Sequence, residues 1–371
     1  MPKDNNILYK IKKSGLIGRG GACFPVWKKW TAVKNALNER PENDRKSYVI
    51  CNASEGEPDV KKDFYILKNY PEKVIAGMLL ALAYLGAKRG YLYINADYYR
   101  ILKVKLEKAA DGAPVEILVK PSGAGYIGGE ETSILNAIEG KRIEPRLKPP
   151  FVFKEGLFGL PTLLNNVETF YNVALVEEGS YRPDRFVTII ERSPKTSFKP
   201  FERLRKIIKR EVFLFPEDWT VEKILKKSGR LPSYKFFVQL GGGASGIVLN
   251  SGQLKNPLTG SGSITIYNLE THDPMELARE WIGFFCGESC GKCVPCREGT
   301  FRVKEQLEKK NVDWPLIKEL LENLAETSFC GLGCSAPIAI TSYFKNVFPL
   351  ISDKDNALAP SQLKTVCECF S

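Results

Sequence analysis

Histidine is almost absent from this sequence, which contains only His272 among 371 residues. Its isolation excludes most zinc sites, and it excludes Ser-His or Cys-His triads that would need a histidine elsewhere. His272 stands in THDPMEL, near a predicted helix N-terminus, where an ordinary surface histidine is expected. Whatever chemistry occurs in this protein is therefore expected to proceed without imidazole.

Long apolar segments are missing as well. The longest run, VIAGMLLALAYLGA, is shorter than the roughly 20 residues that a membrane-spanning helix needs. The N-terminal MPKDNNILYK lacks the apolar region of a signal peptide, so a cytoplasmic protein without a membrane span is expected. The net charge of +11 includes one dense run, FERLRKIIKR, at 201–210. Without nucleic-acid-binding context, this run indicates a solvated helix face or a docking surface for an acidic partner.

The first half of the chain alternates between short β-forming runs and longer helical ones. YVICNA, RGYLYINA and VEILVKP are separated by PEKVIAGMLLALAYLGA and YYRILKVKLEKAADGA. The order β-α-β-α-β favours a parallel sheet covered by helices, with ligands at the carboxyl ends of the strands. A helix is predicted over 161–179, and short strands with one helix form a small α+β module from about 183. Four C-terminal helices suggest a bundle, and they are predicted over 274–286, 296–310, 313–327 and 335–349.

Cysteine is concentrated near the C-terminus, where six of the ten lie between 286 and 334. Cys290, Cys293 and Cys296 follow the spacing C-x2-C-x2-C, and three thiolates from one loop with a distant fourth are typical of a [4Fe–4S] cluster. Cys330 and Cys334 in SFCGLGCSAP are both available as the fourth ligand. We predict Cys330, because the glycines after it let the backbone approach an inorganic core. Zinc is the alternative, although its sites usually use two CxxC pairs or Cys/His mixtures.

Two glycine-rich segments are candidates for binding a cofactor. GLIGRGGACFP at 15–25 precedes the first strand, so it is not a Rossmann fingerprint, but such a loop can wrap a phosphate or a ring edge. GAGYIGGEET links a strand to a helix, where backbone N–H groups can face an anion. It should meet CNASEGEPD, at the end of the first strand, in one crevice.

Several long motifs occur in the same order as in a known family. GRGGACFP, CNASEGEP, GGEETSILNAIEGKRIEPRLKPPF, LLNNVET and ESCGKCVPCREGT resemble the flavin-bearing, NADH-oxidising subunit of respiratory complex I. The same family serves NAD-linked hydrogenases and formate dehydrogenases. The resemblance covers nearly the whole chain and implies FMN, NAD(H) and one [4Fe–4S] cluster. The implied reaction passes a hydride directly between NADH and FMN, so that no catalytic side chain is needed.

The resemblance also implies an architecture of class α/β + α and a set of partners. It implies a Rossmann- or flavodoxin-like FMN/NADH-binding domain over 1–180, a ubiquitin-like α+β domain over 181–271, and a helical bundle with the cluster over 272–371. The division read from the residues agrees. The implied partners are Fe–S electron-transfer subunits of a larger complex, namely a thioredoxin-like [2Fe–2S] subunit and a multi-cluster subunit, with no nucleic acid.

Residue roles follow from the resemblance, position by position. The positions that line FMN are Gly18, Arg19, Gly20, Gly21, Asn52, Glu55, Tyr126, Gly129, Glu130, Asn165, Asn166 and Thr169. The positions that contact NADH are Phe24, Lys29, Glu57, Glu131, Lys148 and Phe151. The cluster ligands are Cys290, Cys293, Cys296 and Cys330. Phe24 and Phe151 could instead be core residues, and Lys148 a solvated loop lysine.

Three positions depart from the family pattern. Ser54 stands where an aspartate is usual, Gly56 where a serine is usual, and Ala32 where a second stacking aromatic is usual. FMN and the cluster are therefore more strongly implied than NADH. The alternative function is a non-catalytic electron carrier or scaffold that does not use NAD(H).

Overall fold

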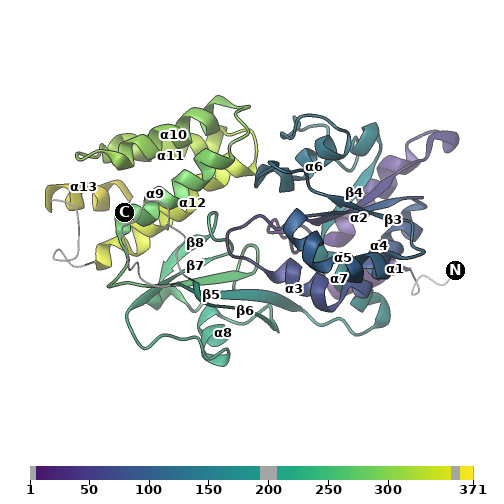
Figure 1. Cartoon of the computed structure of the whole chain (residues 1–371), viewed down its shortest axis with the longest axis horizontal. Coiled ribbons are helices and arrows are strands. Elements are labelled where there is room, and N and C mark those ends of the chain that lie inside the picture. The colour runs from purple at the N-terminus through teal and green to yellow at the C-terminus, as the bar shows by residue number, and fades with distance from the viewer. Residues whose placement is uncertain (1–5, 193–206, 352–359, 371) are drawn as a thin grey trace. The chain divides into compact units, whose positions relative to one another are not determined.

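The computed structural model describes residues 6–192, 207–351 and 360–370, which form two compact units (Figure 1). The first unit comprises Met1–Gly56 and Lys61–Asp184, and the second comprises Glu57–Val60 and Arg185–Ser371. The four residues Glu57–Val60 therefore belong to the second unit, although the chain on both sides of them belongs to the first.

A parallel four-stranded sheet organises the first unit. Its order is β3-β2-β1-β4, and in register Ile50 of β1 lies beside Tyr91 of β2 and Leu164 of β4. The strands are β1 (Tyr48–Ala53), β2 (Gly90–Ile94), β3 (Val115–Val119) and β4 (Thr162–Asn166). The predicted β-α-β-α-β order is confirmed.

Helices cover both faces of this sheet. Helix α6 shares a buried cluster with Ile50, Tyr91 and Leu164 on one face, while α4, α5 and α7 pack together on the other (Figure 1). The helices of this unit are α1 (Ile7–Ser14), α2 (Val26–Asn38), α3 (Lys62–Asn69), α4 (Pro71–Leu85), α5 (Ala96–Ala110), α6 (Glu131–Ile138) and α7 (Val167–Glu178). Short 3-10 turns are η2 (Glu42–Asp44), η3 (Ile127–Gly129) and η4 (Leu157–Gly159).

The helix predicted over 161–179 is wrong in its first part, which is strand β4. Leu163 and Leu164 are both buried, because the sheet is covered on both faces. A strand buried on both sides has a continuous apolar sequence, and periodicity cannot separate it from a buried helix. The helical part begins only at α7, where the Asn166 side chain accepts a hydrogen bond of 3.0 Å from the Glu168 amide.

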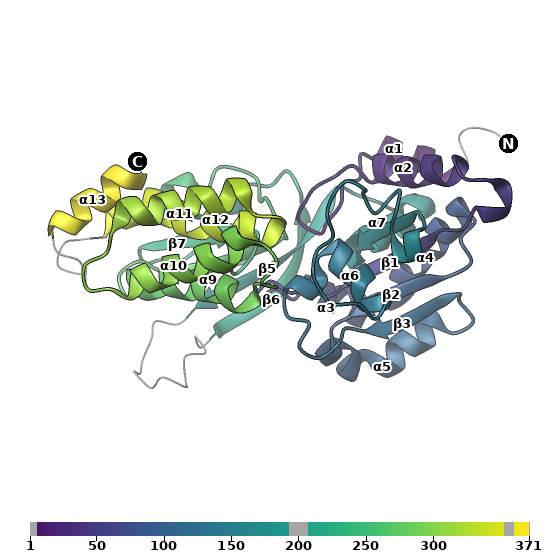
Figure 2. The ribbon, with the colours of Figure 1, turned by 90° about the horizontal axis from the view of Figure 1, so that it is seen from above.

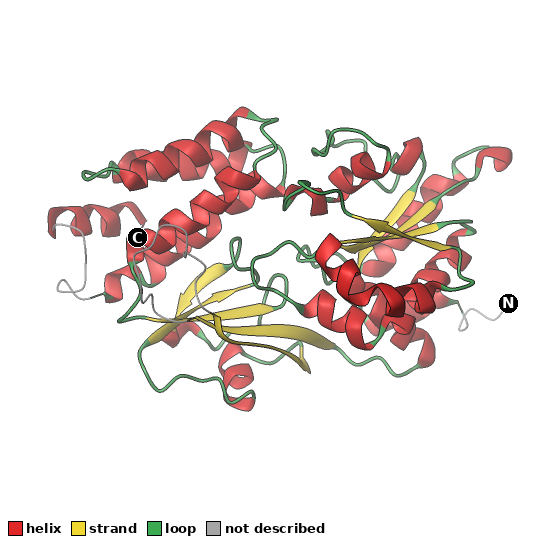
Figure 3. Ribbon diagram, in the orientation of Figure 1, coloured by secondary structure: helices red, strands yellow, loops and turns green. Residues whose placement is uncertain are grey.

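The second unit begins with a mixed five-stranded sheet in the order β6-β5-β9-β7-β8. Alternate residues of β7 face opposite sides: Phe236 and Val238 pack with helix α8, whereas Phe237 packs with the C-terminal helices. Figure 3 shows the strands in yellow and the helices in red. The elements are β5 (Asp184–Arg192), β6 (Ile207–Pro216), α8 (Val221–Lys227), β7 (Phe236–Leu240), β8 (Ile247–Asn250), η5 (Ser251–Gln253) and β9 (Ser263–Asn268). The predicted α+β module is confirmed in its strands and helix, with β6 added.

Helices form the rest of the second unit (Figure 2). They are α9 (Pro274–Glu288), α10 (Val294–Glu308), α11 (Trp314–Thr327), α12 (Gly331–Asn346), η6 (Phe348–Leu350) and α13 (Pro360–Phe370). The four predicted helices are present, but α12 begins at Gly331 instead of 335. Helix α12 also covers the edge strand β8, since the Val248 amide donates to Ser342 Oγ at 2.8 Å and Asn346 Nδ2 donates to the Val248 carbonyl at 2.8 Å. Across the described ranges, no helix combines the length and apolar character needed to cross a membrane.

Two further predictions from the sequence need correction. Residues 207–210 of the basic run lie in strand β6 and not on a helix, while 201–206 lie outside the described residues. His272 is half-buried and not an ordinary surface side chain. Its Nδ1 lies 2.9 Å from the Leu269 carbonyl oxygen and its Nε2 lies 2.6 Å from the Tyr343 hydroxyl.

Candidate functional site

Cysteine thiols gather where helices α10 and α12 begin. Cys293 is the N-cap of α10 and Cys330 is the N-cap of α12. Burial raises the pKa of Cys296 to about 11, and nearby charge on Cys293, Cys330 and Cys290 adds to the effect. Three of the predicted ligands therefore lie within electrostatic reach of the fourth, Cys296. Two helix N-termini in the same place favour bound negative charge, which a thiolate-ligated cluster carries.

Cys334 has different surroundings. Its Sγ donates to the Ser328 carbonyl at 3.5 Å, and its pKa is raised by burial and by charge on Cys293. Of the two glycines after Cys330, Gly333 allows close packing, since a Cβ added to it would lie 2.3 Å from Ser328 Oγ and 3.1 Å from Cys296 Cβ, whereas Gly331 faces open space. Within the described ranges, no three Cys, His, Asp or Glu side chains surround one position for a single metal ion. A [4Fe–4S] cluster is held by Cys thiolates around several iron atoms instead of one ion, so the predicted cluster does not require such a position.

In the first unit, the end of β1 is joined to the second glycine-rich loop, as predicted. Asn52 Nδ2 donates to the Gly129 carbonyl at 2.9 Å, and the Ser54 hydroxyl donates to Asn52 Oδ1 at 2.6 Å. A Cβ on Gly129 would lie 2.9 Å from Ser54 Oγ, so the approach requires glycine. Ser54, at the departure from the family pattern, thus binds the neighbouring Asn52 side chain.

The first glycine-rich loop meets the end of β4. The Arg19 amide donates to Thr169 Oγ1 at 3.0 Å, and a Cβ on Gly20 would lie 3.4 Å from Asn166 Cβ. Gly21 has φ +105°, and a Cβ there would meet nothing within 4 Å. The Arg19 side chain is buried, and its Nη2 donates to the Asp184 carbonyl at 3.3 Å. Three predicted segments therefore meet at the carboxyl ends of β1 and β4, where a parallel sheet binds ligands.

Beneath these loops lies a buried group of charges that the sequence analysis did not assign. Lys62 Nζ lies 2.6 Å from Asp63 Oδ1, 3.2 Å from Glu168 Oε2 and 3.2 Å from Asn166 Oδ1. Asn166 Nδ2 in turn donates to Asp63 Oδ2 at 2.6 Å. Burial alone would lower the pKa of Lys62, but charge on Asp63, Glu168 and Glu55 raises it above its ordinary value. Glu168 lies within the motif LLNNVET, near the start of a mostly apolar helical segment. A charged residue there was the sequence feature that could have indicated a buried ion pair.

Glu55 lies beside this charged group. Its carboxylate accepts hydrogen bonds from the Asp63 amide at 3.1 Å and from the Tyr98 hydroxyl at 2.7 Å. Burial, with charge on Asp63 as the next cause, raises the pKa of Glu55 to about 7. Glu55 therefore exchanges its proton near neutral pH.

The raised pKa of Glu55 predicts a pH-dependent stability. An unfolded glutamate titrates near about 4.3, so between that value and about 7 only the folded state keeps the proton. The free energy of unfolding should therefore fall as the pH rises through this window. Glu55→Gln cannot titrate, so wild type should lose stability relative to this variant between about pH 4.5 and about pH 7.5. Denaturation curves of both proteins across that range measure the difference, and parallel curves would contradict the prediction.

Three predicted nucleotide contacts lie together in the first unit. Lys148 Nζ lies 3.0 Å from Glu130 Oε1 and 2.7 Å from Glu131 Oε1, so it is not simply a solvated lysine. Burial lowers the pKa of Lys29, with charge on Glu131 opposing and charge on Lys148 adding to this shift. Phe24 and Phe151 are 49% and 47% exposed, so the alternative of core residues is wrong for both. Exposed rings and paired charges suit a nucleotide.

Glu57 has a separate setting in the second unit. The Ala244 amide donates to Glu57 Oε2 at 3.1 Å, and the Ser245 hydroxyl donates to Oε1. A Cβ on Gly242 would lie 2.5 Å from the Glu57 carboxyl carbon, so this position must be glycine to leave room for the side chain. The sequence analysis missed Ser245, although GGGASG after a strand was a visible signal.

The fold and these two sites define a flavin- and iron–sulfur-binding oxidoreductase subunit. Residues 11–175 match the Nuo51 FMN-binding domain, and residues 276–351 match the NADH-ubiquinone oxidoreductase-F iron-sulfur binding region. The NADH-quinone oxidoreductase F subunit of Aquifex aeolicus is 34% identical over 355 residues, which cover 88% of this chain and 80% of the relative. The chain therefore belongs to the family of NADH-quinone oxidoreductase F subunits.

Relatives in hydrogenases are longer than this chain. The NAD-reducing hydrogenase HoxS subunit alpha of Cupriavidus necator is 31% identical, over 94% of this chain and 60% of that one. A crystal structure of an H2-reduced NAD+-reducing [NiFe]-hydrogenase matches with a TM-score of 0.80 at 27% identity. That match covers 97% of this chain and 64% of the other, so the chain spans about two thirds of it.

Proposed function

We propose that this NADH dehydrogenase subunit takes a hydride from NADH, or runs the reverse reaction, and passes single electrons to a cluster-bearing partner. When bound, FMN supplies hydride acceptance and one-electron release, and the [4Fe–4S] cluster supplies single-electron transfer. The observation that carries the proposal is the meeting of three glycine-bearing segments at the carboxyl ends of β1 and β4 in a chain of this family. Family membership does not favour a non-catalytic carrier or scaffold.

Within the first unit, the chain's own residues would bind and orient the flavin. Backbone groups near Gly18, Gly20, Gly21 and Gly129 allow close approach, and Asn52 and Thr169 fix the loops that carry them. The proposed FMN site consists of Gly18, Arg19, Gly20, Gly21, Asn52, Glu55, Tyr126, Gly129, Glu130, Asn165, Asn166 and Thr169. Glu55 would hold or release a proton beside it, because its pKa lies at about 7.

The nucleotide and the cluster would use the remaining predicted residues. The proposed NADH contacts are Phe24, Lys29, Glu57, Glu131, Lys148 and Phe151. Aromatic rings suit the adenine, lysines suit the pyrophosphate, and carboxylates suit ribose hydroxyls. The proposed cluster ligands are Cys290, Cys293, Cys296 and Cys330.

Partners and domain organisation are inferred from the family to which the chain belongs. Several relatives are named as subunits of NADH-quinone oxidoreductases or hydrogenases, which supports a partner role. We infer partners of the thioredoxin-like [2Fe–2S] and multi-cluster types, at a cytoplasmic location. We also infer three domains, 1–180 for FMN and NADH, 181–271 as the ubiquitin-like module and 272–371 as the cluster-binding bundle.

Anaerobic titration with NADH tests this function directly. NADH should bleach the flavin absorption band, and dithionite should bleach the same band as a control. Failure of millimolar NADH to bleach a fully flavinated preparation that dithionite does bleach would overturn the proposal.

Ala32 predicts weaker NADH binding than a second aromatic ring would give. Base–aromatic stacking is worth roughly 1–3 kcal/mol, and about 1.4 kcal/mol corresponds to one decade in affinity. Ala32→Phe should therefore tighten NADH binding by about tenfold without changing flavin content. Ala32→Leu is the matched control, because it adds apolar volume without a ring. Equal affinity of the two variants would exclude stacking as the reason.

A further inference from the structure

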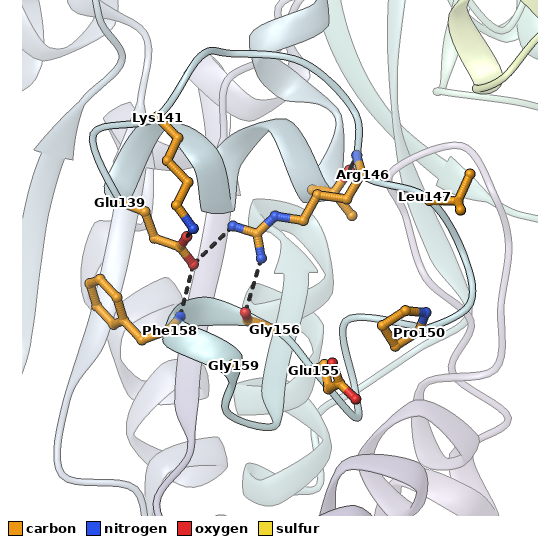
Figure 4. A pocket seen from close by; sticks show the side chains of 10 residues that line it. Glu139, Lys141, Arg146, Leu147, Pro150, Glu155, Gly156, Phe158 and Gly159 are labelled. Atoms are coloured by element: carbon orange, nitrogen blue, oxygen red, sulfur yellow. Dashed lines mark hydrogen bonds and ion pairs between the residues drawn. The ribbon is translucent and has the colours of Figure 1, made fainter.

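The loop between Gly140 and Gly159 carries two of the proposed nucleotide contacts, Lys148 and Phe151. Residues 147–151 are all exposed, so this stretch gains little from apolar burial. A cavity of about 460 Å³ lies inside the loop (Figure 4). Its lining residues are Thr132, Glu139, Lys141, Arg146, Leu147, Pro150, Glu155, Gly156, Phe158 and Gly159. Packing anchors only the far end of the stretch, where Phe151 stacks on Phe153 at 5.6 Å and the next residue, Val152, is buried in the core. The near end borders the cavity, so polar contacts must hold it there.

Arg146, just before the exposed stretch, makes those contacts. Its Nε donates to Asn136 Oδ1 at 2.9 Å, and its Nη1 donates to the Gly156 carbonyl at 3.1 Å. Its backbone amide donates to Thr132 Oγ1 at 2.8 Å. Arg146 therefore joins two parts of the structure to its own end of the loop. These are helix α6, through Thr132 and Asn136, and the other end of the loop, through Gly156.

Glu139 is the charged partner of Arg146 within this cavity (Figure 4). Its Oε1 lies 2.8 Å from Arg146 Nη2, in an ion pair without the alignment of a hydrogen bond. The same oxygen accepts the Phe158 amide at 2.8 Å, and Oε2 lies 2.6 Å from Lys141 Nζ. The Glu139 side chain is 4% exposed, and although burial would raise its pKa, these three partners lower it. A buried carboxylate held in this way is costly to leave unpaired.

We propose that Arg146 and Glu139 are positioning residues for the nucleotide, because their pairing holds in place the exposed stretch with Lys148 and Phe151. The inference rests on the proposed function. Thr132 links this pairing to Glu130, a proposed FMN contact. Its hydroxyl accepts a hydrogen bond from the Arg146 amide and donates one to Glu130 Oε2 at 2.5 Å. The loop is thereby tied to the helix start that carries Glu130 and Glu131.

Arg146→Lys and Glu139→Gln test the pairing in the flavin- and cluster-loaded protein. Lysine keeps the charge but cannot reach Asn136 and Gly156 with one planar fork. The KM for NADH should rise at least about tenfold, equivalent to about 1.4 kcal/mol, while kcat, FMN content and cluster absorbance stay near wild type. Hydrogen exchange at the Phe158 amide should accelerate in both variants. Arg142→Lys is the matched control, since Arg142 pairs with Glu144 in the same loop and does not line the cavity.

Each outcome decides the inference. Faster exchange with unchanged KM would show that the pair only stabilises the fold, and would overturn it. Loss of FMN in both variants, or a fall in kcat with unchanged KM, would overturn it as well. Wild-type flavin that dithionite bleaches but NADH does not would instead remove the proposed function, and this inference with it.

Discussion

Cys330→Ser is expected to lose most of the cluster iron, whereas Cys334→Ser is expected to keep it. Cys330 caps helix α12, and its charge reaches Cys296 together with that of Cys290 and Cys293. Cys334 lies one turn into the same helix, with its Sγ bound to the Ser328 carbonyl. Serine replaces the soft thiolate that iron–sulfur cores prefer. Iron and acid-labile sulfide per protein, together with the spectrum of the reduced cluster, measure the effect.

The paired variants make this assignment decisive, because both remove one sulfur from the same helix. If Cys334→Ser lost the cluster iron and Cys330→Ser kept it, Cys334 would be the fourth ligand and the assignment of Cys330 would be wrong. FMN content is the internal control, since the flavin residues lie in the other unit and should be retained in both variants.

Lys62→Met is expected to destabilise the first unit strongly. Removing the ammonium leaves the carboxylates of Asp63 and Glu168 buried without their shared cation. Breaking a buried pair in this way costs about 3–5 kcal/mol, which corresponds to a fall of roughly 6–20 °C in the midpoint for a unit of this size. The temperature at which bound flavin is released, followed by its fluorescence, reports on this unit.

The neighbouring Lys61→Met is the control for Lys62→Met. Lys61 Nζ donates to the Tyr98 hydroxyl at 3.0 Å, and the Lys61 side chain is less deeply buried. Its loss should lower the midpoint by clearly less. If both variants lowered the midpoint equally, the Lys62 ammonium would not be what stabilises the buried carboxylates of Asp63 and Glu168, and the prediction would be wrong.

Local sequence patterns predicted most elements of the fold but not their boundaries. Strands β1, β2 and β3 and helices α4 and α5 follow patterns of apolar residues and glycine ends that are local in sequence. The start of helix α12 is not visible in the sequence, because its N-cap, Cys330, is not a usual capping residue and its first turn contains the poor helix formers Gly331 and Gly333. Strand β4 was misread because burial on both faces removes the alternation that identifies a strand.

The candidate site shows the same limit. The spacing of Cys290, Cys293 and Cys296 is local, so sequence identified it directly. The pairing of Lys62 with Glu168, and of Glu57 with Ser245, joins residues more than 100 positions apart. No local pattern encodes such contacts, which become visible only in the folded structure.

The short segment Glu57–Val60 has a consequence for how the chain folds. Glu57 binds Ala244 and Ser245 across 187 and 188 positions, and Asp59 pairs with Arg192 across 133. Contacts of such high contact order slow folding, because a long stretch of chain must be closed before they form. During synthesis, Glu57–Val60 leave the ribosome long before Arg185–Ser371. The second unit is complete only when this early segment packs with the later one. A gene divided after Asp184 would therefore give a C-terminal fragment that lacks four of its own residues, and adding a Glu57–Val60 peptide should stabilise that fragment.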